Sequence, residues 1–263
     1  MLGIIRSELT KILTLPSVWI TAGVILAVNL FFQYQSIGFN IETVANIGPD
    51  GLVEVRGQLE SAETVLRQAL EASLFSPSIL LCVLGAVIAG AEFRTGQLGL
   101  SLVAVPGRVR LVLGKIIATT VYALGFGLFC IALAAAFLYV AARDWNPGIL
   151  WSLELLAGEA RILLFMVTFT LIPLAITLIT RRTLSGIIVA MVLVMLTMAQ
   201  VVAVVSPAVD AFLPVSAARN LLLQGTDNPV PLTGSAGHGA MVLIGWTVLT
   251  CIASVLIIRR RDA

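Results

Sequence analysis

The chain is dominated by uncharged apolar stretches that are long enough to cross a lipid bilayer. The first, SVWITAGVILAVNLFFQY, runs from Ser17 to Tyr34 without a charged residue. A helix of about 20 such residues, rising about 1.5 Å per residue, matches a hydrocarbon core about 30 Å thick. Similar stretches recur along the chain, so we expect six membrane-spanning helices, at about 17–34, 73–91, 116–142, 162–180, 186–206 and 239–258.

The composition excludes an ordinary soluble domain. Hydrophobic residues make up 59% of the chain, charged residues only 11%, and the mean hydropathy is +1.05. The sequence therefore predicts a single all-α transmembrane domain over residues 1–263. The net charge of +2 is dispersed between the apolar stretches, which gives no basic face for a nucleic acid, so no nucleic-acid partner is expected.

The positions of Lys and Arg predict the orientation of the chain. Most of them fall at the N-terminus, after the second and fourth stretches, and at the C-terminus, which share one side of the membrane if six spans are correct. The positive-inside rule then places both termini in the cytoplasm. The first stretch is too long for a signal peptide and lacks a small-residue cleavage site, so we expect it to be retained as a helix.

Two kinds of amphipathic segment are expected outside the spans. Before the first span, apolar residues recur at helical spacing around Arg6, Glu8 and Lys11 until Pro16, which favours an interfacial helix over an ordinary basic flank. The connection 38–72 contains turn-forming residues at 46–51 and then an amphipathic helix from Gly57 onwards, acting as a lid or as a spacer.

A proline-broken segment, 207–237, precedes the last span. It is too apolar for a simple loop, and Pro207 and Pro214 interrupt it. We expect a helical pair that dips into the outer leaflet, where surrounding protein satisfies its backbone groups. The only histidine, His238, follows this segment and is expected to be a bystander.

The sequence lacks the usual signatures of catalysis and of cofactor binding. It contains no phosphate-binding loop, no zinc-ligand spacing and no nucleophile elbow, so we expect no catalytic residue, no metal and no cofactor in this chain. The predicted spans hold almost no ionisable residues, so energy for transport must come from a partner if it is used at all. Polar residues inside the spans are the candidates for a translocation path: Asn29, Gln33, Thr168 and Gln200.

The segment between the second and third spans is the most informative one. It reads AEFRTGQLGLSLVAVPGRVRLVLGKIIATTVYA from Ala91 to Ala123. Charged residues stand where the chain leaves and re-enters the bilayer, Gly96 permits a turn, and Pro106 redirects the chain. We therefore expect a short helix over 97–105 that lies beneath the membrane and faces a soluble partner. The alternative is that the basic residues here are only membrane anchors.

The order of these motifs resembles a known family. An E-x-R-x-G pattern, a short apolar helix, then P-x-R and G-K, together with R-S-E-L-x-K at Arg6–Lys11, is similar to the permease subunits of type-two ATP-binding-cassette (ABC) exporters, including the bacitracin-resistance and sodium-export permeases. The likeness covers nearly the whole chain. It departs from the family pattern at Gly96-Gln97-Leu98.

The resemblance implies a function and a set of partners. The crossing beneath the membrane would be a coupling helix that inserts into a separate ABC ATPase subunit, present in two copies that bind ATP and Mg. Its residues would be Glu92, Arg94, Thr95, Gly96, Gln97, Pro106, Arg108 and Lys115. A second permease subunit, identical or homologous, would pack against the first and fifth spans in the lipid of a bacterial cell membrane.

The function implied is ATP-driven export of a hydrophobic or amphipathic substrate such as a drug, peptide or lipid. The chain itself would be a permease and not an enzyme. The alternative from another class is a membrane scaffold or immunity protein that binds a lipid or peptide without transport. An enzyme that acts on lipid is the weakest hypothesis, because the spans lack a paired acid and base.

Overall fold

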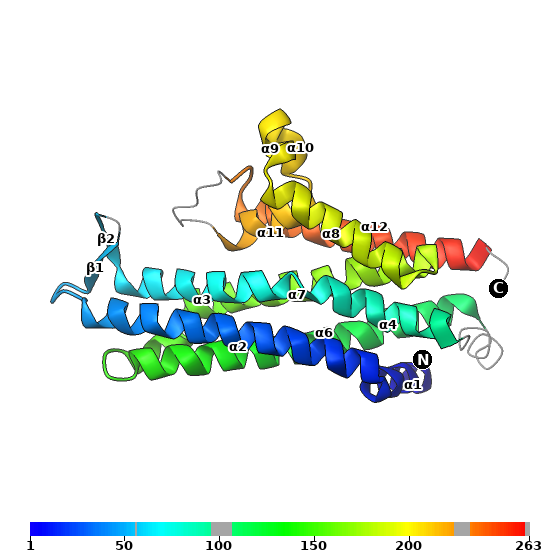
Figure 1. Ribbon diagram of the computed structural model, residues 1–263, viewed down its shortest axis with the longest axis horizontal. Helices are drawn as coiled ribbons and strands as arrows, with labels where there is room; N and C mark the ends of the chain where they lie inside the picture. The colour runs from blue at the N-terminus through cyan, green and yellow to red at the C-terminus, as the bar shows by residue number, and fades with distance from the viewer. Residues whose placement is uncertain (56, 96–106, 224–231, 261–263) are drawn as a thin grey trace.

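The chain forms an elongated bundle of long helices with a small hairpin at one end (Figure 1). The computed structural model describes residues 1–55, 57–95, 107–223 and 232–260. In chain order the elements are α1 (Leu2–Thr14), α2 (Pro16–Ala45), β1 (Leu52–Val55), β2 (Gln58–Ser61), α3 (Ala62–Ser78), α4 (Leu81–Thr95), α6 (Arg108–Ala142), the 3-10 helix η1 (Pro147–Trp151), α7 (Leu153–Thr180), α8 (Thr183–Met198), α9 (Val201–Val205), α10 (Pro207–Asp210), α11 (Pro214–Leu222) and α12 (Ala236–Arg260).

Five helical segments of the described residues are long and apolar enough to cross a membrane. They are Pro16–Ala45, Ala62–Phe93, Val109–Ala142, Leu153–Thr180 and Ala236–Arg260. Each extends beyond the apolar stretch that predicted it, because a helix continues into its charged flanks where the hydropathy signal stops. These segments define a membrane-embedded helical protein.

The predicted fifth span, 186–206, is not one continuous helix. α8 has 16 residues and ends at Met198, and Gln200 takes the left-handed conformation with φ of 55° before the five-residue α9 begins. A helix of 16 residues reaches only about 24 Å. The hydropathy pattern does not reveal this break, because apolar residues indicate burial in protein or lipid but not whether the backbone stays helical. Here the break depends on the dihedral angles of Gln200.

The predicted second span, 73–91, and the external helix before it form one candidate membrane span, Ala62–Phe93, interrupted only at residues 79–80. Helix α3 runs through Ser73 without a break and meets α4 at Ile79–Leu80. Pro77 lies just before this joint, and because proline lacks an N–H and crowds the preceding turn, it weakens the helix there. The start of the apolar stretch therefore did not mark the start of the helix.

The hairpin β1–β2 was not predicted. The sequence predicts an amphipathic helix from Gly57 onwards, but residues 57–61 form a turn and a strand that pairs Glu60 with Val53 and Leu59 with Glu54. Gly57, with φ of 82°, closes the connection in a conformation that glycine adopts without strain. The turn expected at 46–51 is present, and the carbonyl of Gly51 accepts a hydrogen bond from the amide of Ala62 at 3.1 Å.

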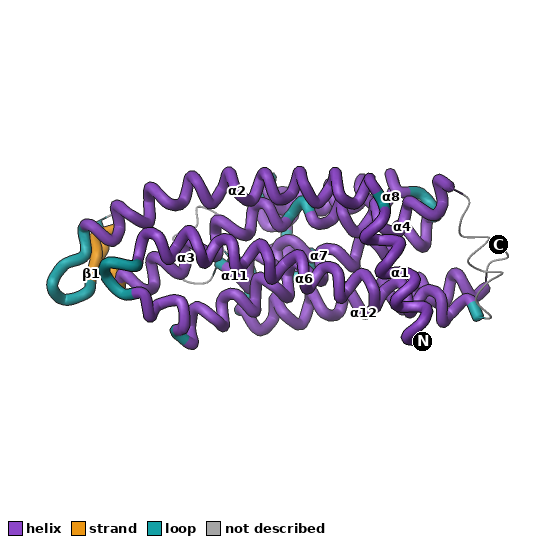
Figure 2. The backbone as a smooth tube through the Cα atoms, turned by 90° about the horizontal axis from the view of Figure 1, so that it is seen from below, coloured by secondary structure: helices purple, strands orange, loops and turns teal. Residues whose placement is uncertain are grey.

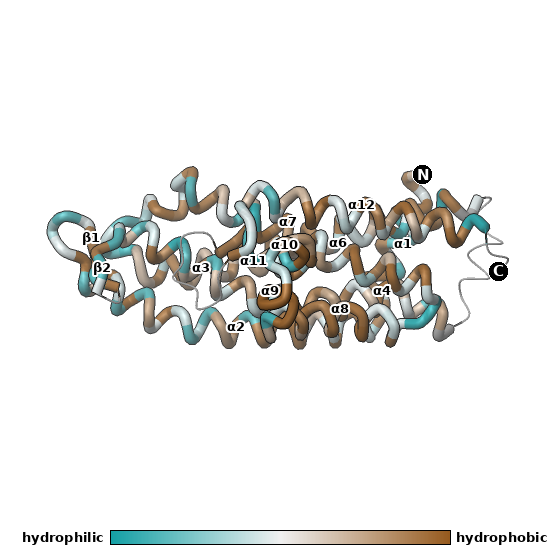
Figure 3. The backbone as a smooth tube through the Cα atoms, turned by 90° about the horizontal axis from the view of Figure 1, so that it is seen from above, coloured by the Kyte–Doolittle hydropathy of each residue, from teal (hydrophilic) through white to brown (hydrophobic). Residues whose placement is uncertain are grey.

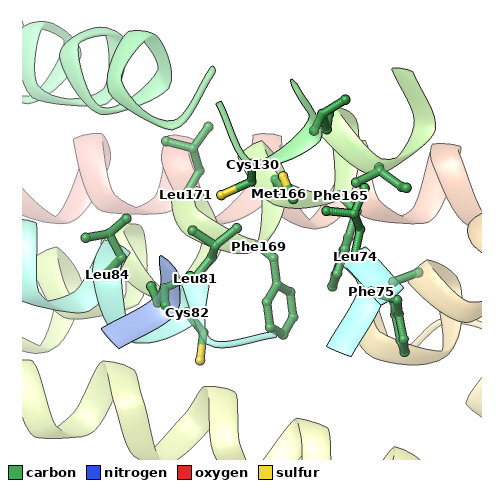
Figure 4. Packing of buried hydrophobic residues seen from close by; sticks show 14 of the residues in the cluster. Leu74, Phe75, Leu81, Cys82, Leu84, Cys130, Phe165, Met166, Phe169 and Leu171 are labelled. Carbon is green, nitrogen blue, oxygen red and sulfur yellow. The ribbon is translucent and has the colours of Figure 1, made fainter. Parts of the chain in front are cut away.

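Helix α7 is the centre of the bundle and packs against α3, α4, α6, α8 and α12. Figure 4 shows its residues Phe165 and Phe169 among side chains from α3 and α4; the rings of Phe165 and Phe75 stack at 5.5 Å between centroids. The α4–α7 contact is close because Gly85 lies directly against the backbone carbonyl of Thr170. Gly85 of α4 thus serves packing within the chain.

The two ends of the bundle differ. The N-terminus, the last residues of α4, the first residues of α6 and the end of α12 lie at one end, and the hairpin lies at the other (Figures 1 and 2). α2 has 30 residues and α6 has 35, so they are about 45 and 53 Å long and exceed a hydrocarbon core of about 30 Å. Hydrophilic residues gather at the hairpin end, whereas α8 is strongly apolar (Figure 3).

Candidate functional site: a buried charge cluster

The N-terminal helix α1 packs against the start of α6. Its spacing of apolar residues forms the expected amphipathic helix, in which Glu8 and Ile12 are the two buried residues. Gly114 of α6 leaves room for the side chain of Ile4, so that the two helices approach closely. This contact carries one acidic residue of α1 into the interior of the bundle.

Four charged side chains from three helices meet at this contact. Lys115 Nζ of α6 lies 2.6 Å from Glu8 Oε2 of α1 and 3.1 Å from Glu92 Oε1 of α4. Lys11 Nζ lies 2.6 Å from Glu8 Oε1 and 2.9 Å from Glu92 Oε1. Two acids and two cations therefore alternate in a closed ring with no net charge, which we call the charge cluster.

Because the charge cluster is buried, each of its four charges depends on the others for stabilisation. The side chains of Glu8, Glu92 and Lys115 are at most 4% exposed, whereas that of Lys11 is 30% exposed. Charges removed from water are tolerated only when they are paired, and the loss of one partner leaves another charge buried and uncompensated. Removal of a single member should therefore disturb α1, α4 and α6 together.

Lys11 is held in its charged form by the two acids. Burial by itself would lower the pKa of Lys11, but hydrogen bonds to Glu8 and Glu92 and their negative charges more than offset this, so the pKa lies above its ordinary value of 10.5. Lys11 closes the cluster on its solvent-facing side. The carboxylate oxygen Oε2 of Glu92 has no hydrogen-bond partner among the described residues.

The charge cluster unites two sets of residues that the sequence placed in different motifs. Glu8 and Lys11 belong to the expected interfacial helix, and Glu92 and Lys115 belong to the expected coupling region. α4 ends at Thr95, shortly after Glu92, and α6 begins at Arg108. The cluster therefore fixes both helices that flank the predicted coupling helix.

The remaining predicted coupling residues are placed only in part. Arg94 and Thr95 lie in the last turn of α4, and Arg108 is the first residue of α6. Gly96, Gln97, Pro106 and the helix expected over 97–105 lie outside the described residues. Arg6 is exposed on α1, away from the charge cluster.

The four predicted path residues belong to three separate parts of the fold. Asn29 and Gln33 are buried on one face of α2, and Gln33 Oε1 accepts a hydrogen bond from Ser73 of α3 at 3.2 Å. The hydroxyl of Thr168 bonds to carbonyls of its own helix, as a packed threonine does. Gln200 occupies the break after α8. Only the α2 pair has unmatched buried groups, at Asn29 Oδ1 and Gln33 Nε2.

Sequence reasoning missed a further buried acid, Glu71, outside the charge cluster. It is 1% exposed, its Oε1 lies 3.2 Å from Arg67 and 3.4 Å from Arg161 of α7, and Gly158 gives it room. Glu71 and Arg67 lie in the candidate span Ala62–Phe93, and Arg161 lies in the candidate span Leu153–Thr180. The sequence did contain a signal for this burial, because no helix-breaking residue separates Glu71 from the apolar stretch that follows.

A third polar group ties the proline-broken segment together. Asp210 accepts hydrogen bonds from Ser216 at 2.8 Å and from Thr233 at 3.1 Å. Burial lowers the pKa of nearby Arg219, and the negative charge of Asp210 opposes this shift. His238 Nε2 lies 3.2 Å from the carbonyl of Ala211. These contacts hold α10 and α11 against α12 and assemble no catalytic set among the residues described here.

Comparison with known proteins leaves the family open. No protein-family profile matches the chain, and no curated protein matches it significantly. The class that the fold defines is therefore a helical membrane-embedded protein.

Proposed function

We propose that the chain is the membrane-spanning subunit of an ATP-driven exporter in a bacterial cytoplasmic membrane. In this proposal both termini lie in the cytoplasm, two ABC ATPase subunits bind beneath the membrane and supply ATP and Mg, and a second permease subunit completes the pathway. The chain carries no ATPase site of its own. Its cargo is hydrophobic or amphipathic.

The observation that carries the proposal is the charge cluster. A permease driven by a soluble partner needs a rigid connection between the surface that the partner touches and the helices that form the pathway. Lys115 contacts acids from both α1 and α4, so α1, the end of α4 and the start of α6 are held together. A plain membrane anchor would need basic residues facing water or lipid headgroups, and not a buried, neutral ring of four charges.

The mechanism follows from this rigidity. When the ATPase subunits close on ATP, they displace the α4–α6 connection, and the charge cluster moves α1, α4 and α6 as one body. Helix α4 packs on the central helix α7 through Gly85. The displacement thus passes to the centre of the bundle and shifts the population from an inward-open to an outward-open state.

A purification from the native host tests this proposal. The tagged chain, extracted in a mild detergent, should retain a protein that hydrolyses Mg-ATP. Glu92→Gln should keep that partner but reduce stimulation of its ATPase by the permease. The matched control is Asp144→Asn, which removes one acid whose side chain is 87% exposed outside the charge cluster.

Two results would contradict the proposal. Absence of any ATP-hydrolysing partner would favour the scaffold or immunity protein that binds a lipid or peptide. Wild-type stimulation by a Glu92→Gln variant of normal size and helicity would show that the charge cluster does not transmit closure.

A further inference from the structure

Two neighbouring hollows lie beside α2 and the hairpin. The first, of about 510 Å³, is formed by α2, α3 and the hairpin, and the second, of about 620 Å³, by α2 and the hairpin; Phe39 and Val55 line both. Each volume is within the range of sites that hold small molecules. We call the pair the outer groove, because the hairpin that helps to form both hollows lies at the end of the bundle opposite the N-terminus (Figure 2).

The charges that line the outer groove are all of one sign among the described residues. Glu60 lines the first hollow, and Glu42 and Glu54 line the second. Apolar and aromatic surface is supplied by Phe32 and Phe39 of α2, and Phe39 is 45% exposed. An aromatic face beside carboxylates attracts a cation with an apolar body, because both the ring and the acids favour positive charge.

Two buried amides bond to serines that line the first hollow. Gln33 and Asn40 are at most 3% exposed, yet Gln33 Nε2 and Asn40 Oδ1 lack hydrogen-bond partners among the described residues. Each is bonded through its other amide atom to a serine that lines the first hollow, Gln33 to Ser73 and Asn40 to Ser36. Neither amide lines a hollow itself. Their bonds hold Ser36 and Ser73 in place, so that the two hydroxyls form a fixed polar part of the wall of the first hollow.

We propose that the outer groove binds organic cations with an apolar body. The acids receive the positive charge, Phe32 and Phe39 contact the apolar part, and Ser36 and Ser73 provide hydrogen-bonding groups. The proposal goes beyond export, because it concerns equilibrium binding by this chain alone. Its test needs neither an ATPase nor transport, so its failure is distinct from failure of the proposed function.

The test measures binding of tetraphenylphosphonium to the purified full chain in a nonionic detergent by equilibrium dialysis, with protein-free micelles as the blank. Tetraphenylborate, an anion of the same shape, is the matched probe. Saturable binding of the cation, at least tenfold tighter than that of the anion, is expected.

Variants locate the site. Glu60→Gln should weaken cation binding about three- to tenfold, and Phe39→Leu, which keeps an apolar side chain but removes the ring, about two- to fivefold. Asp144→Asn and Phe129→Leu make the same changes at exposed positions outside the groove and should stay within about twofold of wild type.

The proposal is overturned if binding of the cation does not saturate, if the anion binds as tightly, or if Glu60→Gln has no more effect than Asp144→Asn. Unchanged helicity and a monodisperse elution profile establish that the variants are folded. Should Phe39→Leu fail to fold, Glu60→Gln alone decides the outcome, since Glu60 lies at the edge of the hairpin strand and is partly exposed.

Discussion

Replacement of Lys115 by methionine is the sharpest perturbation of the charge cluster. Methionine keeps most of the side-chain volume and removes the positive charge that lies 2.6 Å from Glu8 and 3.1 Å from Glu92. The two buried acids would then share Lys11 alone. Because breaking a buried ion pair by removing one partner costs about 3–5 kcal/mol, we expect a loss of that size in the free energy of unfolding.

Lys11→Met should cost less than Lys115→Met. Both lysines contact the same two acids, but the side chain of Lys11 is 30% exposed and that of Lys115 only 4%, so water compensates part of the loss at Lys11. The double variant Lys115→Met/Glu8→Gln restores neutrality. We expect its loss to be about 1–3 kcal/mol smaller than the sum of the two single losses.

The assay is equilibrium unfolding with SDS in mixed micelles, followed by the far-ultraviolet circular dichroism of the helices. It gives the free energy of unfolding for each single variant and for the double variant. Additive losses, or equal losses for Lys11→Met and Lys115→Met, would refute the idea that burial couples the four charges.

Three further predictions concern other parts of the fold. Gly85→Ala should destabilise the chain by about 1–3 kcal/mol, because a Cβ would meet the carbonyl of Thr170, whereas Gly245→Ala, with open space around it, should not; thermal unfolding of both variants checks this. Gln200→Gly should raise the free energy of unfolding by a few tenths to about 1 kcal/mol, since glycine adopts φ of 55° without strain, and a decrease would contradict this reading. The raised pKa of Lys11 means that its contribution to stability is complete below 10.5 and is lost as the pH rises through the higher folded value. The difference in stability between wild type and Lys11→Met should therefore shrink in strongly alkaline solution, and a difference that grows there would be inconsistent with the shift.

Hydropathy predicted the membrane-spanning class and most of the helices because apolar length is a property of local sequence. It could not find the break at Gln200 or the turn at Gly57, since both depend on single backbone conformations. The hairpin was missed for a related reason: Leu59 fits the apolar face of a helix as well as it fits a strand, and pairing with β1 decides between them.

The candidate site was predictable only in pieces. Glu8 and Lys11 were recognised on one helix and Glu92 and Lys115 around a second motif, but their meeting joins residues as far apart as Glu8 and Lys115. Such long-range contacts follow from packing, which local patterns do not encode. Glu71 was missed because the candidate span that contains it begins at Ala62, before the apolar stretch from which the second span was predicted.

The central claim is that the connection between α4 and α6 contacts an ATPase. The most direct measurement introduces a photo-crosslinking amino acid at Gln97 in cells of the native host and identifies the product by mass spectrometry. A control probe at Leu153, which is 83% exposed in α7, reports non-specific capture. Gln97, and not Leu153, should crosslink to a protein with an ATP-binding phosphate loop. Crosslinks from Gln97 only to lipid or to a second copy of this chain would contradict it.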